Sequence, residues 1–153
     1  MAAEDEYVVE TEIGLRPEPG APAPLLAQSE HDCYLVFNAV QEPGGAIGTG
    51  VVEAVGCDIT RFGYPNDEAI AGHPLWARGL NPYAVSEVIH SSWVTQLDEQ
   101  NRVAFPDYNR PPKRHFIIAF HDSTFECVAD ELNARIVNVS REEAYAEIAK
   151  SLE

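Results

Sequence analysis

The chain has 153 residues, which is about the length of one domain and enough to bury a substantial core. Its formal net charge is -15, from 25 acidic and 10 basic side chains, and a field of that sign repels nucleic acids and anionic membranes. The N-terminus is acidic, and no apolar run approaches the roughly 18–20 residues that a membrane span needs. We therefore expect a cytoplasmic protein whose partner is a protein with a basic surface. We expect it to bind neither nucleic acid nor membranes.

The composition along the chain predicts a single domain over residues 1–153. An acidic strand region (1–14) is followed by a proline-rich loop (15–30), a β-rich body (31–139) and a C-terminal helix (140–152). The loop begins with four prolines in ten residues. Because proline lacks the amide donor that a sheet needs, we expect this segment to be extended and unpaired.

Two strands are predicted in the first half of the body. β-Forming residues fill positions 33–40 and predict a buried strand, and the composition of 41–50 is typical of a turn. Residues 51–63 then predict one long strand with a bend at Gly56, because a glycine within a strand often marks a bulge.

The second half of the body combines a strand, a short helix and a hairpin. A strand is expected near 84–90 and a helix near 92–101, with Ser91 or Ser92 as its N-cap. On this helix, Trp93 is expected to face the core together with its apolar neighbours.

The stretch RHFIIAFHDSTFECVADEL predicts a β-hairpin with a two-residue turn at 122–123. Such a turn would pair His121 with Thr124 and would make His121 and Glu126 diagonal neighbours on one face. The alternation of side chains gives the other face six apolar residues: Phe116, Ile118, Phe120, Phe125, Cys127 and Ala129.

The C-terminal segment predicts an amphipathic helix. Ser140 and Glu143 have the spacing of a capping box, and the expected apolar stripe consists of Tyr145, Ile148, Ala149 and Leu152. With about six strands, mostly antiparallel, a short central helix and this C-terminal helix, the expected fold class is α+β. A doubly wound parallel sheet is disfavoured because helices and strands do not alternate.

The loop GYPNDEAIAGHPLWARGLNPY, residues 63–83, concentrates chemically capable side chains. Asp67 is expected to cap a short helical turn that Gly72 ends, and His73 precedes a proline and should be extended. Long loops of defined shape often carry function. The candidate binding residues in this loop and at the hairpin tip are Asp67, Glu68, Trp76, Tyr83 and Asp122.

Histidine and carboxylate side chains suggest one catalytic constellation. His73 of the loop would meet His121 and Glu126 of the hairpin, and these residue types suit general acid–base work. The competing interpretation is that the same side chains satisfy turn amides and face solvent. No two histidines are two or four residues apart, so the sequence predicts no metal ligand and specifies no cofactor.

The three cysteines are Cys33, Cys57 and Cys127, and none forms a C-x-x-C pair. An odd number without a secretion signal predicts reduced, unpaired thiols that pack as small hydrophobic residues.

Two functions remain open from sequence alone, because the signature motifs for nucleotide binding, serine hydrolases and metalloproteases are absent. The first is a non-catalytic protein-binding role, as in an accessory, inhibitor or immunity-like protein, in which the acidic charge steers a basic partner. The alternative is a small enzyme, with or without a metal ion, that uses histidine and carboxylate groups from the 63–83 loop and the 115–129 hairpin. The enzyme hypothesis predicts that the loop and the hairpin surround one concave pocket.

Overall fold

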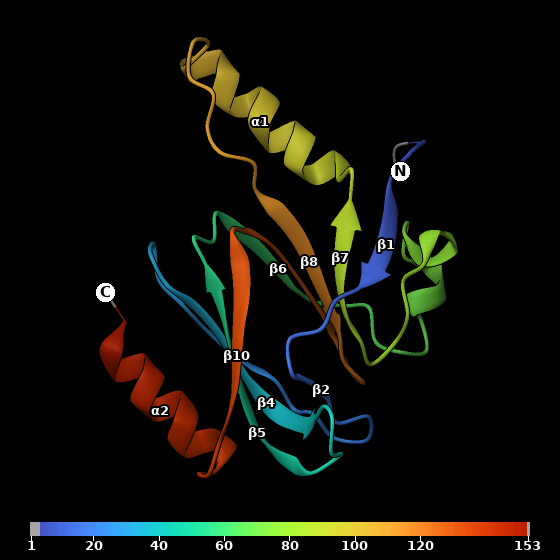
Figure 1. Ribbon diagram of the computed structural model, residues 1–153, viewed down its shortest axis with the longest axis vertical. Coiled ribbons are helices and arrows are strands. Elements are labelled where there is room, and N and C mark those ends of the chain that lie inside the picture. The colour runs from blue at the N-terminus through green and yellow to red at the C-terminus, as the bar shows by residue number, and fades with distance from the viewer. Residues whose placement is uncertain (1–3, 153) are drawn as a thin grey trace.

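Two antiparallel β-sheets form the centre of the computed structural model, which describes residues 4–152 (Figure 1). Sheet A contains, in spatial order, β1 (Tyr7–Glu10), β7 (Val85–Ile89), β8 (Arg114–Ala119), β9 (Thr124–Ala129) and β6 (Ile59–Gly63). Sheet B contains, in spatial order, β10 (Glu131–Val137), β5 (Ile47–Val55), β4 (Cys33–Gln41) and β2 (Leu15–Pro17), with β3 (Leu25–Gln28) also paired to β4. The helical elements are α1 (Ser92–Ala104), α2 (Arg141–Ser151) and the 3-10 turns η1 (Ile70–Gly72) and η2 (Trp76–Arg78).

These elements confirm the α+β class, with more strands than the six expected. No helix within residues 4–152 is long and apolar enough to cross a membrane.

The main core lies between the two sheets. It combines Leu35 and Phe37 of sheet B with Phe116, Ile118 and Phe125 of sheet A, all nearly inaccessible to solvent. The hairpin face predicted from sequence is confirmed, because all six of its apolar residues belong to this core. Burial of these apolar and aromatic side chains between the sheets stabilises the fold.

Each sheet also has an outer face, and the two outer faces are covered differently. On sheet B, α2 packs Ala144 and Ile148 against Ala27, Val36 and Val51. On sheet A, the 63–83 loop packs three buried residues against the sheet: Ile70, Leu75 and Leu80. The candidate site lies on this outer face of sheet A.

The proline-rich segment is not the unpaired loop that was expected. It contributes β2 and β3, and both pair with β4. The prolines are tolerated because β2 is an edge strand and Pro17 is its last residue, where an amide donor is not needed for the ladder.

The prediction for residues 41–63 also needs correction. β5 begins at Ile47, inside the expected turn, and the chain leaves sheet B after Val55 to enter sheet A at Ile59. Gly44 and Gly45 have positive φ and form the turn before β5. Gly50 lies within β5 and serves close packing instead, since a Cβ there would lie 2.8 Å from the Cβ of Ala39. Gly56 has a φ of +62° and forms the crossing between the sheets rather than a bend within one strand.

Helix α2 begins as predicted. Ser140 is the N-cap, and its hydroxyl accepts a hydrogen bond from the Glu143 amide at 3.1 Å. The buried face is rotated from the expected stripe, because Ala144 rather than Ala149 is buried beside Ile148. Tyr145 and Leu152 pack at the margin of the same cluster as partly buried residues.

Candidate functional site

Side-chain alternation on β8 and β9 carries two titratable residues to the outer face of sheet A. Phe116 and Cys127 are paired across the strands and point into the core between the sheets. Their neighbours His115 and Glu126 therefore point the opposite way. Both are buried, with exposed fractions of 2% and 7%, so the structure must satisfy them with polar partners.

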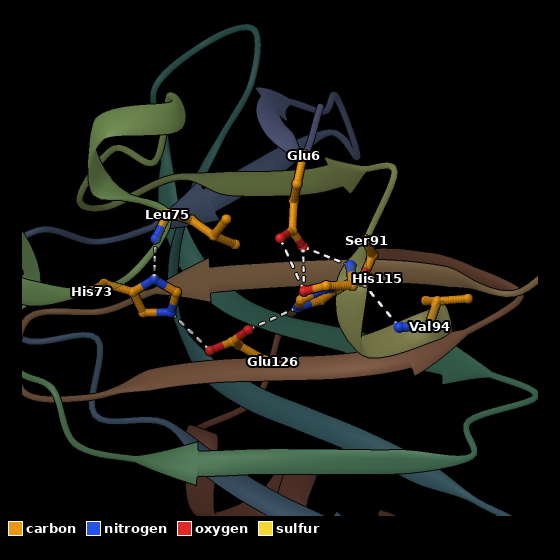
Figure 2. A network of polar contacts seen from close by, with 8 residues as sticks. Glu6, His73, Leu75, Ser91, Val94, His115 and Glu126 are labelled. Carbon is orange, nitrogen blue, oxygen red and sulfur yellow. Dashed lines mark hydrogen bonds and ion pairs between the residues drawn. The ribbon is translucent and has the colours of Figure 1, made fainter. Parts of the chain in front are cut away.

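Those partners form a continuous chain of hydrogen bonds (Figure 2). His73 Nε2 lies 3.0 Å from one carboxylate oxygen of Glu126, and His115 Nε2 lies 2.7 Å from the other. On the far side of the His115 ring, Nδ1 lies 2.7 Å from the hydroxyl of Ser91. The network thus joins the loop, both strands of the hairpin and the residue that precedes α1.

The hydrogen-bond pattern assigns the ring protons of both histidines. The backbone amide of Leu75 donates to His73 Nδ1 at 3.0 Å, so the proton of that ring lies on Nε2. A carboxylate only accepts, so His115 also carries a proton on the Nε2 that faces Glu126. In the neutral form of His115, Nδ1 is then a lone pair that accepts the hydroxyl proton of Ser91.

Glu126 is held as a carboxylate. Burial opposes its ionisation, but the hydrogen bonds from His115 and His73 outweigh this effect and lower the pKa of Glu126 to about 2. The carboxylate is therefore a fixed negative charge that orients both imidazole rings. It is a poor proton acceptor itself, which leaves His115 as the proton acceptor nearest to a hydroxyl group.

Ser91 occupies the junction between β7 and α1. It is the N-cap of α1, and its hydroxyl accepts from the Val94 amide at 3.2 Å. The preceding residue, His90, has a φ of +56°, which is uncommon for a residue other than glycine. This backbone conformation turns the chain sharply from strand to helix and directs Ser91 toward His115 (Figure 2). Strained backbone of this kind tends to occur at functional sites.

A second carboxylate fixes the N-terminal end of α1. Glu6 is 2% exposed, and it accepts from the Ser92 amide at 2.8 Å and from the Ser92 hydroxyl at 2.9 Å (Figure 2). The positive end of the helix dipole also stabilises a carboxylate at this position. Glu6 therefore positions the helix start that carries Ser91.

Two clefts adjoin the network. The larger has a volume of about 590 Å³ and is lined by Ser91 and its neighbours at the β7–α1 junction. The smaller has a volume of about 380 Å³ and is lined by His73 and Glu126. Ser92, Gln96 and His115 line both clefts, so the two clefts adjoin. Both volumes fall in the range of small-molecule sites.

A basic side chain lines the smaller cleft. Arg61 on β6 is directly opposite Glu126 on β9, so both residues face the same side of sheet A. The Arg61 guanidinium stacks over the ring of Trp93 at 3.8 Å from its centroid. Trp93 in turn packs edge-on against His115, with ring centroids 5.1 Å apart. This stack places a positive charge beside the network without burying it.

The structure brings together two of the three predicted catalytic residues. His73 and Glu126 meet as expected, but His121 does not join them. The hairpin loop has four residues rather than two, so Ala119 pairs with Thr124 and the register moves by two residues. The longer loop is fixed by the 63–83 segment, whose Asp67 amide donates to the His121 carbonyl at 2.9 Å. His115 therefore takes the diagonal position beside Glu126.

The predicted binding residues lie away from both clefts. Asp67 accepts a hydrogen bond from the Tyr83 hydroxyl and forms an ion pair with His121 at 3.7 Å, while Asp122 bonds to the same histidine at 2.8 Å. These contacts form a separate cluster at the hairpin tip. Glu68 is exposed, and Trp76 is 38% exposed.

The expected cap of the loop is also different. Asn66, not Asp67, caps the short turn, because its side-chain oxygen accepts from the Ala69 amide at 3.0 Å. The Asp67 carboxylate is engaged by Tyr83 instead.

Sequence reasoning missed His115, Arg61 and Glu6 as site residues and noted Ser91 only as a helix cap. A signal for His115 was present, since it directly precedes Phe116 of the apolar face and alternation therefore places it on the opposite face, together with Glu126. Glu6 and Arg61 reach the site through long-range strand pairing, for which the sequence has no local signal.

Within residues 4–152, no group of three or more histidine, cysteine, aspartate or glutamate side chains is arranged to hold a metal ion. Each Nε2 of the two network histidines instead donates to Glu126. The chemistry that this arrangement can perform is proton transfer from a hydroxyl to an imidazole that a fixed carboxylate orients.

Comparison with protein-family models, with curated proteins and with solved structures found no match to this chain.

Proposed function

We propose that this protein is a small serine-dependent enzyme that transfers or hydrolyses acyl groups. The observation that carries the proposal is the chain Ser91–His115–Glu126, in which both hydrogen bonds are 2.7 Å long and the serine lines a cleft of about 590 Å³. A hydroxyl, an imidazole and a buried carboxylate in this order are the parts of a nucleophilic serine site, which is recognised by geometry and roles rather than by sequence position.

Each residue has a role in the proposed reaction. His115 Nδ1 accepts the hydroxyl proton of Ser91 as the serine oxygen attacks the acyl carbon. Glu126 accepts from Nε2 of the same ring and stabilises the imidazolium that forms. His73 donates to the second oxygen of Glu126 and so positions the carboxylate. The His115 proton then passes to the leaving group, and water releases the acyl group by the reverse sequence.

The two ring nitrogens of His115 have exchanged roles relative to the well-known serine triad, in which the serine faces Nε2. Here Ser91 faces Nδ1 and the carboxylate faces Nε2. The proton inventory is the same in both arrangements, because either ring nitrogen can accept a proton while the other donates.

The start of α1 supplies donors for the negative oxygen that develops on the substrate. The amides of Ser92 and Val94 donate to Glu6 and Ser91, and the amide of Trp93 lies between them at the positive end of the helix. The developing oxyanion would lie at this positive end of α1, which stabilises negative charge.

The clefts favour a small, polar acyl substrate. The cleft beside Ser91 is lined by several charged side chains, among them Glu87, Lys113 and Arg114. Arg61 adds a positive charge in the smaller cleft, and it suits a carboxylate or phosphate group of the substrate.

The test is a hydrolysis assay with a panel of short-chain aryl esters and thioesters. Ser91→Ala should lower kcat/KM by at least about 100-fold, because nucleophile and base act as a unit. Ser140→Ala is the matched control, since Ser140 also caps a helix but has no histidine partner in the network. The control should retain wild-type activity. Equal rates for wild type and Ser91→Ala, or no turnover of any member of the panel, would overturn the proposal.

A second candidate function is non-catalytic binding of a basic protein, and the net charge of -15 favours it. It also fits the exposed aromatic residues Tyr64 and Trp76, which are 82% and 38% exposed. Under either function we propose a cytoplasmic location, which the three unpaired cysteines support. Association that weakens steeply with added salt, together with an inactive wild type in the ester panel, would favour binding.

A further inference from the structure

The three cysteines, far apart in sequence, meet in the folded protein. Cys33 begins β4 in sheet B, and Cys127 lies in β9 of sheet A. Both belong to the core between the sheets, and Cys57 packs against this core from the crossing between β5 and β6. We call these three residues the thiol cluster.

The thiols of the cluster interact with one another. Cys57 interacts electrostatically with both Cys33 and Cys127, and its Sγ also lies 3.6 Å from the carbonyl oxygen of Ile59. All three cysteines are unpaired. Cys57 therefore has two alternative thiol partners within the cluster.

The backbone of the crossing fixes Cys57 in this position. Gly56 has a φ of +62°, which only glycine adopts readily, and Lys113 Nζ donates to its carbonyl oxygen at 2.7 Å. The amide of Asp58 donates to the Val128 carbonyl at 2.8 Å, on the strand that carries Cys127. Cys57 is held from both sides along the chain.

The cluster has one solvent-facing member. Cys33 and Cys127 are 1% and 0% exposed, whereas Cys57 is only partly buried. Hydrogen bonds from Cys127 and Cys33 hold the pKa of Cys57 well below that of an ordinary thiol, with a smaller contribution from Lys113. The pKa values of Cys33 and Cys127 are raised, because both donate to Cys57 and are buried. The thiolate, which is the reactive form, is thus located on the accessible residue.

We propose that the thiol cluster is a peroxide-oxidised modification site, in which Cys57 reacts first and a buried neighbour converts it to a disulfide. An accessible thiolate beside a resolving thiol is the arrangement found in redox-sensing cysteines. The cluster lies on the opposite side of β9 from Glu126, so this proposal stands independently of the acyl-transfer function.

The chemistry balances with hydrogen peroxide as the oxidant. The Cys57 sulfur attacks one oxygen, the O–O bond breaks, and hydroxide leaves to give a sulfenic acid. The sulfur of Cys33 or Cys127 then attacks the Cys57 sulfur, a disulfide forms, and water is released. Two thiols lose two electrons in total, and one peroxide is reduced to two waters.

The experiment is treatment of the full-length protein with dilute hydrogen peroxide, followed by intact mass and a thiol count after denaturation. We expect the monomer mass to fall by about 2 Da and the count to fall from three thiols to one. Peptide mapping should find Cys57 in the disulfide, and dithiothreitol should restore three thiols. A gain of oxygen without the 2 Da loss, or a disulfide between two chains, would overturn the proposal.

Variants separate the first thiol from the resolving thiols. Cys57→Ala changes a partly exposed residue and should fold normally, yet it should lose the fast 2 Da change. Cys33→Ala and Cys127→Ala each leave Cys57 with one partner and should retain that change. If Cys57→Ala forms a disulfide at the wild-type rate, Cys57 is not the reactive thiol and the proposal fails.

Discussion

The two outer faces of the β-sandwich meet the same structural need in different ways. On sheet B, α2 covers the sheet with apolar side chains, and Ile148 and Ala144 are its buried residues. On sheet A, the outer face itself carries a buried carboxylate, Glu126, and the buried imidazole of His115 beneath the 63–83 loop. Apolar packing covers a sheet at no electrostatic cost, whereas a buried carboxylate must be compensated by hydrogen bonds.

This difference indicates what the sheet A face is for. A structure selected for stability alone could use apolar residues on both faces, as it does on sheet B. Instead the sheet A network needs three aligned hydrogen bonds and a strained residue, His90, to place Ser91 beside His115. Such arrangements are typical of sites where function rather than stability determines the residues.

The largest effect on stability is expected when the charge at the centre of the sheet A face is removed. Glu126→Gln replaces one acceptor oxygen with an amide donor that faces an imidazole N–H, so one hydrogen bond is lost and two donors oppose each other. We expect a loss of about 3–4 kcal/mol in the free energy of unfolding, measured by urea denaturation. Glu147→Gln on the exposed side of α2 is the control and should change stability by less than about 0.5 kcal/mol. A cost at Glu126 equal to the control would mean that the network contributes nothing to stability.

The same carboxylate should make stability depend on pH. The folded-state pKa of Glu126 is about 2, below its ordinary value of 4.5, so its contribution is complete above about pH 5 and is lost as the pH falls toward 2. The loss should be about 3 kcal/mol in the wild type. The comparison to make is between urea midpoints of wild type and Glu126→Gln across this range. Parallel pH profiles would show that other groups cause the acid sensitivity.

A substitution on the sheet B face should lower stability without affecting function. Ile148→Ala removes a buried side chain from the α2 cluster and should cost roughly 2–3 kcal/mol. Ile136→Ala, at a residue that is 37% exposed, should cost clearly less. Ester hydrolysis by folded Ile148→Ala should match the wild type, because α2 lies across the sandwich from Ser91. A selective loss of activity would show that the two faces are coupled.

The features predicted from the sequence are those that depend on local pattern. Ser140 as a helix cap and the apolar face of the hairpin are both confirmed, since capping and alternation involve neighbours in the chain. The meeting of His73 with Glu126 was also anticipated, although it spans 53 residues. That prediction rested on chemistry: a histidine of the loop and a carboxylate of the hairpin were expected to lie on the same side of the domain.

The incorrect predictions concern contacts between residues that are far apart in the chain, which the local sequence pattern does not encode. A hairpin turn longer by two residues keeps every side chain on its face but changes each cross-strand partner, so His115 replaced His121 beside Glu126. The turn length is set by contacts with the 63–83 loop, including the bond from Asp67 to the His121 carbonyl. Such tertiary contacts override the local preference of Asp and Ser for a tight turn.

The central claim is that Ser91 is an activated nucleophile and not merely a helix cap. The most direct measurement is covalent labelling of the folded protein with a fluorophosphonate probe, followed by peptide mapping. If Ser91 is activated, we expect one label per chain, located on Ser91, with labelling abolished in Ser91→Ala, strongly slowed in His115→Gln and unchanged in Ser140→Ala. Ser140 is the internal comparison, because its hydroxyl accepts a similar capping bond at 3.1 Å, against 3.2 Å for Ser91. If Ser91 reacts no faster than Ser140 in the folded wild type, the hydroxyl is only a cap and the account is wrong.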